Sequence, residues 1–199
     1  MLQKICVFCG SSIGNNSAYA DAAESLGEEI AKKGMELTYG GGNIGLMGII
    51  ADRVLKEGGK VTGVMPKHLA DHEIAHENLH ELKIVEDMMQ RKKVLLEISD
   101  AFIALPGGFG TLDEMSEAIT WNQLKLMNKP VGFLNIHGYY DELIAFINRA
   151  TDDALIRSEH RDTIILEDKP TKILDRLKSF EGTSMDKWIR DIKSEKRKA

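Results

Sequence analysis

The segment LPGGFGTLDE, Leu105–Glu114, combines residue types that could bind an anion and act on it. It continues a four-residue apolar run, Phe102–Leu105, which predicts the end of a buried strand. The glycines that follow allow the backbone to approach a ligand closely. A helix that starts after them would offer unpaired N–H groups and a partial positive charge. We therefore expect a phosphate-sized site here.

Two adjacent carboxylates, Asp113 and Glu114, are expected in the first turn of that helix. A favourable interaction with the helix dipole would account for one of them. The other is then a candidate to face a ligand bound at the same end of the helix.

Two further loops share this composition, Cys9–Asn16 (CGSSIGNN) and Tyr39–Gly48 (YGGGNIGLMG), and each is expected to follow a strand. A glycine-rich turn is often only a tight connection, but three at one sheet edge favour a binding site. Neither the P-loop lysine pattern nor a strict G-x-G-x-x-G is present, so a nucleoside monophosphate fits better than a triphosphate or a dinucleotide. The candidate loop contacts are Gly10, Ser11, Gly41, Gly42 and Gly107.

Positive charge near these loops could come from Arg91, Lys92 and Lys93 on a predicted helix. A solvated helix face is the alternative explanation for this run. The chain has a net charge of −5 and a pI near 5.7, which argues against general nucleic-acid binding and requires local attraction of any anion. An arginine can bind a phosphate through two parallel hydrogen bonds.

Histidines recur every fourth residue at His68, His72, His76 and His80, and HEIAH (72–76) matches a zinc-peptidase motif. On one continuous helix they would form a stripe able to bind a metal. Pro66 and the polar surroundings instead suggest a short helix or loop whose histidines face solvent or a partner chain, and no third ligand follows in a fixed pattern. We predict no metal site.

Cys6 and Cys9 form a C-x-x-C pair within an apolar run. Positions three apart on a strand point to opposite faces, so the two sulfurs are expected to diverge. No second cysteine pair exists to complete a zinc site. We interpret both as packing thiols.

Short apolar runs alternate with helical patterns along the chain, which predicts an α/β fold: a Rossmann-like, doubly wound parallel sheet of about seven strands with helices on both faces. In such sheets ligands bind at the carboxyl ends of the strands. The predicted strands are Ile5–Cys9, Glu36–Tyr39, Val61–Met65, Leu82–Val85, Ala101–Leu105, Val131–Leu134 and Thr163–Leu166. The predicted helices are Ser17–Lys33, with Ser17 as N-cap and Gly34 as its stop, and Leu46–Glu57, Met88–Ile98, Leu112–Met127, Tyr139–Asp153 and Thr171–Lys178.

The 199 residues are expected to form one nucleotide-binding domain over 1–180, followed by a C-terminal helix and basic tail over 181–199. No apolar run approaches the ~20 residues that span a bilayer. The amino-terminal residues lack the cleavage pattern of a signal peptide. We expect a cytoplasmic protein that binds neither membrane nor nucleic acid.

The chain resembles the LOG ("lonely guy") phosphoribohydrolases, long mislabelled as lysine decarboxylases, from about Lys4 to Leu166. PGGFGTLDE (Pro106–Glu114) fits that family's PGGxGTxxE pattern, and YGGGNIGLMG and the QRK of Gln90–Lys92 agree in order and spacing. Many relatives have histidine where this chain has Met89, which removes a polar neighbour of Arg91.

The resemblance implies a Rossmann-like homodimer that needs no cofactor. It would hydrolyse the N-glycosidic bond of adenosine-type 5′-monophosphates, which in plants are cytokinin riboside monophosphates, to free base and ribose 5-phosphate. Arg91 and Glu114 would be the essential pair. Substrate contacts would come from Glu73, Arg91, Lys92, Gly108, Phe109, Gly110, Thr111, Leu112, Asp113, Glu114 and Thr120.

The implied chemistry is consistent with these residue types. Cleavage of a ribosyl C–N bond builds positive charge on the sugar, which a carboxylate such as Glu114 can stabilise while it activates water. Arg91 could bind phosphate or sugar hydroxyls, or polarise the leaving base. A non-catalytic nucleotide carrier or sensor is the alternative function. A pyridoxal-dependent decarboxylase gains no support, because no lysine stands in a cofactor context.

Dimerisation is expected from the resemblance. The predicted helix Leu112–Met127 has more apolar surface than one sheet face should need, although core packing would also explain it. The residues concerned are Met115, Ile119, Trp121, Leu124 and Met127.

Overall fold

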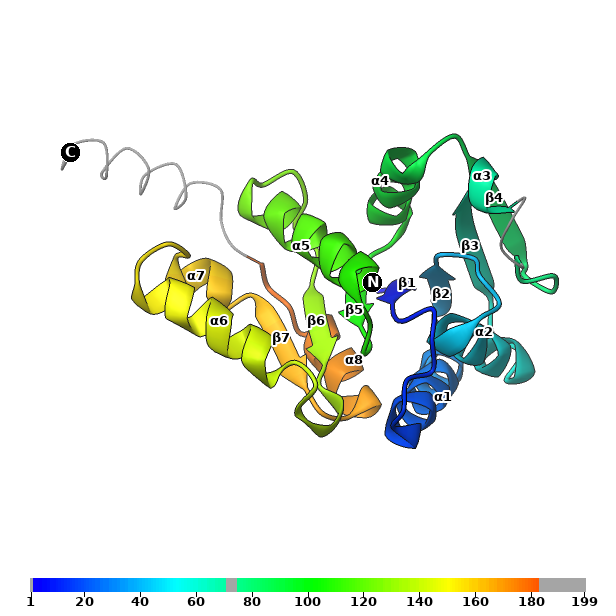
Figure 1. Cartoon of the computed structure of the whole chain (residues 1–199), viewed down its shortest axis with the longest axis horizontal. Helices are drawn as coiled ribbons and strands as arrows, with labels where there is room; N and C mark the ends of the chain where they lie inside the picture. Colours follow the sequence, from blue (N-terminus) through cyan, green and yellow to red (C-terminus); the bar gives the residue numbers. More distant parts are fainter. Residues whose placement is uncertain (1, 71–74, 183–199) are drawn as a thin grey trace.

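The computed structural model describes residues 2–70 and 75–182, and in these residues strands and helices alternate as predicted (Figure 1). The strands are β1 (Lys4–Phe8), β2 (Glu36–Tyr39), β3 (Val61–Pro66), β4 (Glu81–Val85), β5 (Ala101–Ala104), β6 (Val131–Leu134) and β7 (Ile164–Glu167). The helices are α1 (Ser17–Lys32), α2 (Gly45–Lys56), α3 (Lys67–Ala70), α4 (Met88–Ile98), α5 (Phe109–Gln123), α6 (Asp141–Asp152), α7 (Ser158–Arg161) and α8 (Pro170–Lys178), with a 3-10 turn η1 (Ile136–Gly138) before α6.

All neighbouring strands pair in parallel, in the order β4-β3-β2-β1-β5-β6-β7. The chain starts in the middle of the sheet, winds outward to β4, and returns to add β5, β6 and β7 on the other side of β1. This doubly wound topology reverses direction between β1 and β5, and ligands bind at such a switch point. The predicted fold class is therefore confirmed.

Helices cover both faces of the sheet (Figure 1). One core cluster joins α1, α2 and α8 to one face, and the other joins α4, α5 and α6 to the opposite face. Central strands β1 and β5 are buried on both sides, which explains their continuous apolar runs. Cys6 lies in the second cluster and Cys9 packs against the first, so the expected divergence of the two thiols is confirmed.

Most predicted elements are present, with shifted ends. Asn16, rather than Ser17, caps α1, because its side-chain oxygen accepts a hydrogen bond from the N–H of Ala18 at 3.0 Å. Gly34 follows the helix with φ +67°, as expected of a glycine that ends a helix. The largest shift is in α5, which begins three residues earlier and ends four residues earlier than predicted.

The short helix α3 lies directly after Pro66, where a short helix or loop was expected, whereas α7 had no prediction of its own. The predicted tail over 181–199 lies almost wholly outside the described residues. Within residues 2–70 and 75–182, no helix combines the length and apolar character needed to cross a bilayer.

Candidate active site at the topological switch point

The three glycine loops meet at the carboxyl ends of β1, β2 and β5. In chain order, the first loop is in Cys9–Asn16, the second in Tyr39–Gly48 and the third in Leu105–Glu114. The N–H of Gly10 donates a hydrogen bond to the carbonyl of Pro106 at 3.1 Å, which joins the first loop to the third. The N–H of Leu46 donates to the carbonyl of Gly10 at 3.1 Å, which joins the first loop to the second. Gly45, with φ +59°, lies so close to the backbone of Ser11 that a side chain would collide with it. The predicted convergence at one sheet edge is confirmed.

The second loop is held from its other side by residues 75 and 76. Gly42 forms a bridge with Ala75, and the carbonyl of Gly41 accepts a hydrogen bond from the N–H of His76 at 3.0 Å. Gly41 and Gly42 are buried there. Gly41 and Gly42 therefore support this edge of the sheet from inside, whereas Ser11 is exposed at its surface.

The third loop has one enclosed glycine and two open ones. A Cβ on Gly107 would overlap the side chain of Thr111, which is buried beneath the loop. At Gly108 and Gly110 a Cβ would meet no atom within 4 Å. The backbone is therefore bare where α5 begins, and a ligand can reach its N–H groups directly.

The start of α5 at Phe109 corrects the predicted position of the carboxylates. Asp113 and Glu114 lie in the second turn, and the first turn contains no acidic residue. Gly108 is the N-cap residue of α5. Its backbone is extended, and no side chain caps the helix. Since the dipole interaction falls off within the first turn, it does not explain these carboxylates. The lack of an acidic residue in the first turn leaves the N–H groups of that turn available to an anion.

Glu114 is half-buried, and burial raises its pKa to about 7. The positive charge of Arg91 opposes this shift, while Asp113 adds to it. Burial raises the pKa of both Cys6 and Cys9, and the charge of Glu114 adds to this shift, which places this carboxyl group near the end of β1. Such a pKa, close to neutral, is typical of a group that exchanges protons in catalysis.

Arg91 lies on α4, and its guanidinium group packs directly on Gly40, the residue after β2. A Cβ at Gly40 would overlap the guanidinium, so only glycine leaves room for it. One guanidinium nitrogen contacts Sδ of Met88 at 3.6 Å, and Nε is buried without a hydrogen-bond partner among the described residues. A buried donor without a partner is uncommon in folded proteins. Arg91 on α4 lies near enough to Glu114 on α5 for its charge to lower the pKa of that carboxyl group.

Lys92 joins those two helices. Its ammonium group lies 3.1 Å from Asp113 and 2.8 Å from Glu117, both on α5. The contact with Glu117 is the main reason that its pKa is raised. Lys92 thus fixes the helix of Arg91 against the helix of Glu114.

The remaining predicted contacts differ in exposure. Phe109 is 92% exposed, Leu112 is half-buried and Thr120 is exposed on α5. Glu73 lies outside the described residues.

The histidines do not form one stripe. The helix α3 that contains His68 ends at Ala70, and His72 lies outside the described residues. His76 is buried, contrary to expectation: its Nε2 lies 3.0 Å from Asp52 and its Nδ1 accepts a hydrogen bond from the N–H of Asn78. His80 accepts from the N–H of Val61 at 3.4 Å. Within the described part of the chain, no three His, Cys, Asp or Glu side chains are grouped as metal ligands.

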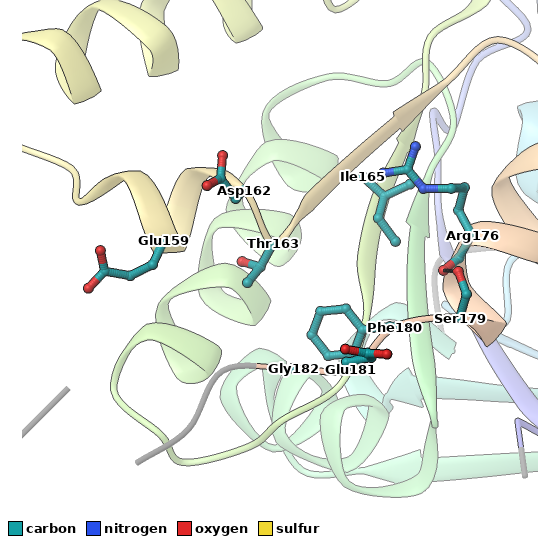
Figure 2. Close-up of a pocket in the computed structure, with 9 residues that line it drawn as sticks. All are labelled: Glu159, Asp162, Thr163, Ile165, Arg176, Ser179, Phe180, Glu181 and Gly182. Atoms are coloured by element: carbon teal, nitrogen blue, oxygen red, sulfur yellow. Dashed lines mark hydrogen bonds between the residues drawn. The ribbon is translucent and has the colours of Figure 1, made fainter. Parts of the chain in front are cut away.

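Cavities lie at both edges of the sheet. One of about 310 Å³ is at the glycine loops, lined by Gly10, Ser11, Ser12, Ile13, Gly14, Tyr19, Leu46, Pro106, Gly107, Gly108 and Tyr139. Another, of about 410 Å³, lies between the start of β7 and the end of α8 (Figure 2). Its side chains include three acids, Glu159, Asp162 and Glu181, while its Arg176 bonds Glu167 at 3.0 Å. This charge would repel a phosphate, as would Asp21, Asp141 and Asp168 in a cavity of about 660 Å³ beside η1. The cavity at the glycine loops is therefore the better phosphate site; Gly107 and Gly108 line it, whereas Arg91 and Glu114 do not.

Sequence reasoning missed three supporting features of the site. These are the contact of Arg91 with Gly40, the pairing of His76 with Asp52, and the tyrosines at 139 and 140. The sequence does show Gly40, as the first glycine of YGGG, and the two tyrosines, as the pair YY after a glycine. Neither pattern identifies the residue that is contacted.

Comparison with known proteins gives relatives over most of the chain. The family model described as "Possible lysine decarboxylase" matches residues 47–177. "Probable cytokinin riboside 5'-monophosphate phosphoribohydrolase LOGL6" of Oryza sativa subsp. japonica is 47% identical over 178 residues, covering 89% of this chain and 71% of that protein. "Cytokinin riboside 5'-monophosphate phosphoribohydrolase LOG1" of Arabidopsis thaliana is also 47% identical, covering 89% and 84%.

Solved structures with the same architecture include a molybdenum cofactor binding protein from Rippkaea orientalis, with a TM-score of 0.69 and 24% identity over 90% of this chain and 97% of that one. The Moco carrier protein of Chlamydomonas reinhardtii gives a TM-score of 0.70 at 20% identity, covering 90% and 98%. At these identities the likeness shows the fold alone.

Proposed function

The chain belongs to the LOG family, and we propose that it hydrolyses the N-glycosidic bond of adenosine-type nucleoside 5′-monophosphates to free base and ribose 5-phosphate. Relatives 47% identical to it are named as phosphoribohydrolases of cytokinin riboside 5′-monophosphates. The structural observation that supports this function is a half-buried Glu114, whose pKa the charge of Arg91 lowers, beside the bare start of α5.

The phosphate binds, in this proposal, to the backbone N–H groups of Gly107, Gly108, Gly110 and Thr111. These groups lie at a helix start, where the partial positive charge favours an anion. Binding of the phosphate fixes the sugar, so that binding energy remote from the reacting bond is used to orient it. Arg91 supplies a further donor through its unpartnered Nε and binds an oxygen of the ribose or phosphate.

The reaction breaks the bond between C1′ and the purine nitrogen, and the electron pair of that bond leaves with the base. Ionised Glu114 stabilises the positive charge that develops on the sugar and accepts a proton from the attacking water. The water oxygen forms the new bond to C1′ and keeps its second hydrogen as the new hydroxyl group. The proton accepted by Glu114 passes to the departing base, which restores the carboxylate. Atoms and charge balance without a metal or a redox partner.

A rise of activity with pH is the expected consequence of the pKa of Glu114, which burial raises to about 7. Below this value the carboxyl group is protonated and cannot stabilise positive charge. Above it the group is ionised and active. Plots of kcat/KM against pH should therefore show an ascending limb near pH 7 that disappears in Glu114→Gln. Activity that falls as the pH rises through 7 would instead make Glu114 a proton donor.

The experiment that tests the function is incubation with AMP and with its N6-isopentenyl analogue, without added metal. Chromatography should detect free base and ribose 5-phosphate in equal amounts, and a chelator should not reduce the rate. Binding of AMP without release of base would favour the alternative, a nucleotide carrier or sensor. The relative rates on the two substrates would identify the preferred base.

A lysine decarboxylase activity finds no support at this site. An amine that forms an imine with pyridoxal phosphate must lose its proton, which a lowered pKa favours. Lys92, the lysine adjacent to Arg91, has a raised pKa because it contacts Glu117 and Asp113.

We further propose a cytoplasmic homodimer that binds neither nucleic acid nor membrane. Apolar side chains exposed on and after α5 support the dimer: Phe109 is 92% exposed and Leu126 is 63% exposed. Met115 is buried in the core, so it does not contribute to such a surface. Light scattering should give twice the 22.2 kDa mass of one chain. A mass of 22.2 kDa at micromolar concentration would refute the dimer.

A further inference from the structure

Three successive carbonyl groups in the third glycine loop each accept a hydrogen bond from another part of the chain. The hydroxyl of Tyr140 donates to Leu105 at 2.6 Å, the N–H of Gly10 donates to Pro106 at 3.1 Å, and the hydroxyl of Tyr139 donates to Gly107 at 2.7 Å. The carbonyl side of the loop is therefore fully paired just before the helix begins.

The N–H side of the same loop is open. No N–H group from 107 to 111 has a hydrogen-bond partner among the described residues. The peptide bond between Gly107 and Gly108 is trans, so the N–H of Gly108 points away from the carbonyl of Gly107. The bond from Tyr139 holds the carbonyl of this peptide group and therefore helps to set the direction of the N–H on its other side.

Tyr139 is itself held rigidly. Its ring makes edge contacts with Tyr19, at a centroid distance of 5.4 Å, and with Tyr140, at 5.0 Å. The preceding turn is fixed by Asn135, whose side-chain oxygen accepts a hydrogen bond from the N–H of Tyr140 at 2.7 Å. A phenol held in this way can define a peptide orientation without contacting the ligand.

We propose that Tyr139 is a positioning residue of the phosphate site, which orients the N–H of Gly108 toward the anion through its hydrogen bond to Gly107. This inference rests on the proposed function, in which the phosphate binds at the start of α5. Tyr140 has a different role, because its hydroxyl is buried and bonds a carbonyl two peptide groups further from the helix.

The test is Tyr139→Phe, which removes the hydroxyl and keeps the ring. Tyr139 is 42% exposed, so the variant is expected to fold. Loss of one orienting hydrogen bond should weaken phosphate binding roughly tenfold. We expect this change in the Kd of inorganic phosphate and of ribose 5-phosphate by calorimetry, and in the KM of AMP, with kcat within about twofold. The kcat/KM for adenosine, which has no phosphate, should stay unchanged.

The matched control is Thr163→Val at the opposite edge of the sheet, which likewise removes a hydroxyl that donates to a backbone carbonyl, that of His160 at 2.7 Å, and leaves the bond to Gly107 in place. It should bind phosphate as the unmodified protein does. Unchanged phosphate affinity in Tyr139→Phe, or equal losses on AMP and adenosine, would overturn the inference. Failure of the proposed function would be seen differently, because the unmodified protein would then release no base. Phosphate binding in the two variants would still decide the role of Tyr139.

Discussion

Replacement of Glu114 by glutamine should lower kcat for base release by roughly 10²–10³-fold, as expected when one preorganised electrostatic group is lost. Glutamine keeps the shape of the side chain but cannot carry the negative charge that stabilises the sugar in the transition state. The KM for the nucleotide should change little, because phosphate binding depends on backbone N–H groups rather than on this carboxyl. Single-turnover measurement of base release at pH 8 checks the prediction.

The loss should not result from unfolding. The pKa of Glu114 is raised in the folded protein, so its ionisation opposes folding increasingly as the pH rises from about 4.5 to about 7 and fully above that. Glutamine removes this unfavourable charge, so Glu114→Gln should melt no lower than the unmodified protein at pH 8. A matched control is Glu97→Gln on α4, which neutralises an exposed glutamate and should leave kcat unchanged. Turnover in Glu114→Gln equal to that of the unmodified protein would exclude Glu114 from the mechanism.

The backbone of the site could be predicted from the sequence because glycines and strand–helix alternation are local signals. Each loop follows its strand within a few residues, and the doubly wound topology then brings the loops to one edge. The start of α5 was predicted wrongly because glycines at 108 and 110 suggested a longer loop. Helical geometry begins at Phe109 despite the poor helix propensity of Gly110.

Contacts between distant side chains could not be predicted in this way. The burial of His76 depends on Asp52, which is 24 residues away and on another element. The bond from Tyr139 to Gly107 spans 32 residues. Such pairs depend on how helices pack across the sheet, and hydrophobic periodicity does not specify that packing at the level of single atoms.

Replacement of Gly40 by alanine should lower kcat/KM by roughly tenfold to a hundredfold with little change in stability. The new methyl group would occupy the position of the Arg91 guanidinium, which must then move. Displacement of a catalytic group by about 1 Å can cost on the order of a hundredfold in rate. The cost in stability is small because the displaced atoms are the end of a flexible side chain, and Gly40 does not have a positive φ. Steady-state kinetics and thermal melting together check both parts.

A double-mutant cycle separates this effect from a direct effect on the loop. Arg91→Ala should lower kcat/KM strongly, and Gly40→Ala should cost nothing further in that background, because no guanidinium remains to be displaced. Additive losses would show that Gly40 acts independently of Arg91. The pH profile provides a second readout: the positive charge of Arg91 lowers the pKa of Glu114, so its displacement should move the ascending limb above pH 7. A profile that stays in place, with additive losses, would exclude coupling between Gly40, Arg91 and Glu114.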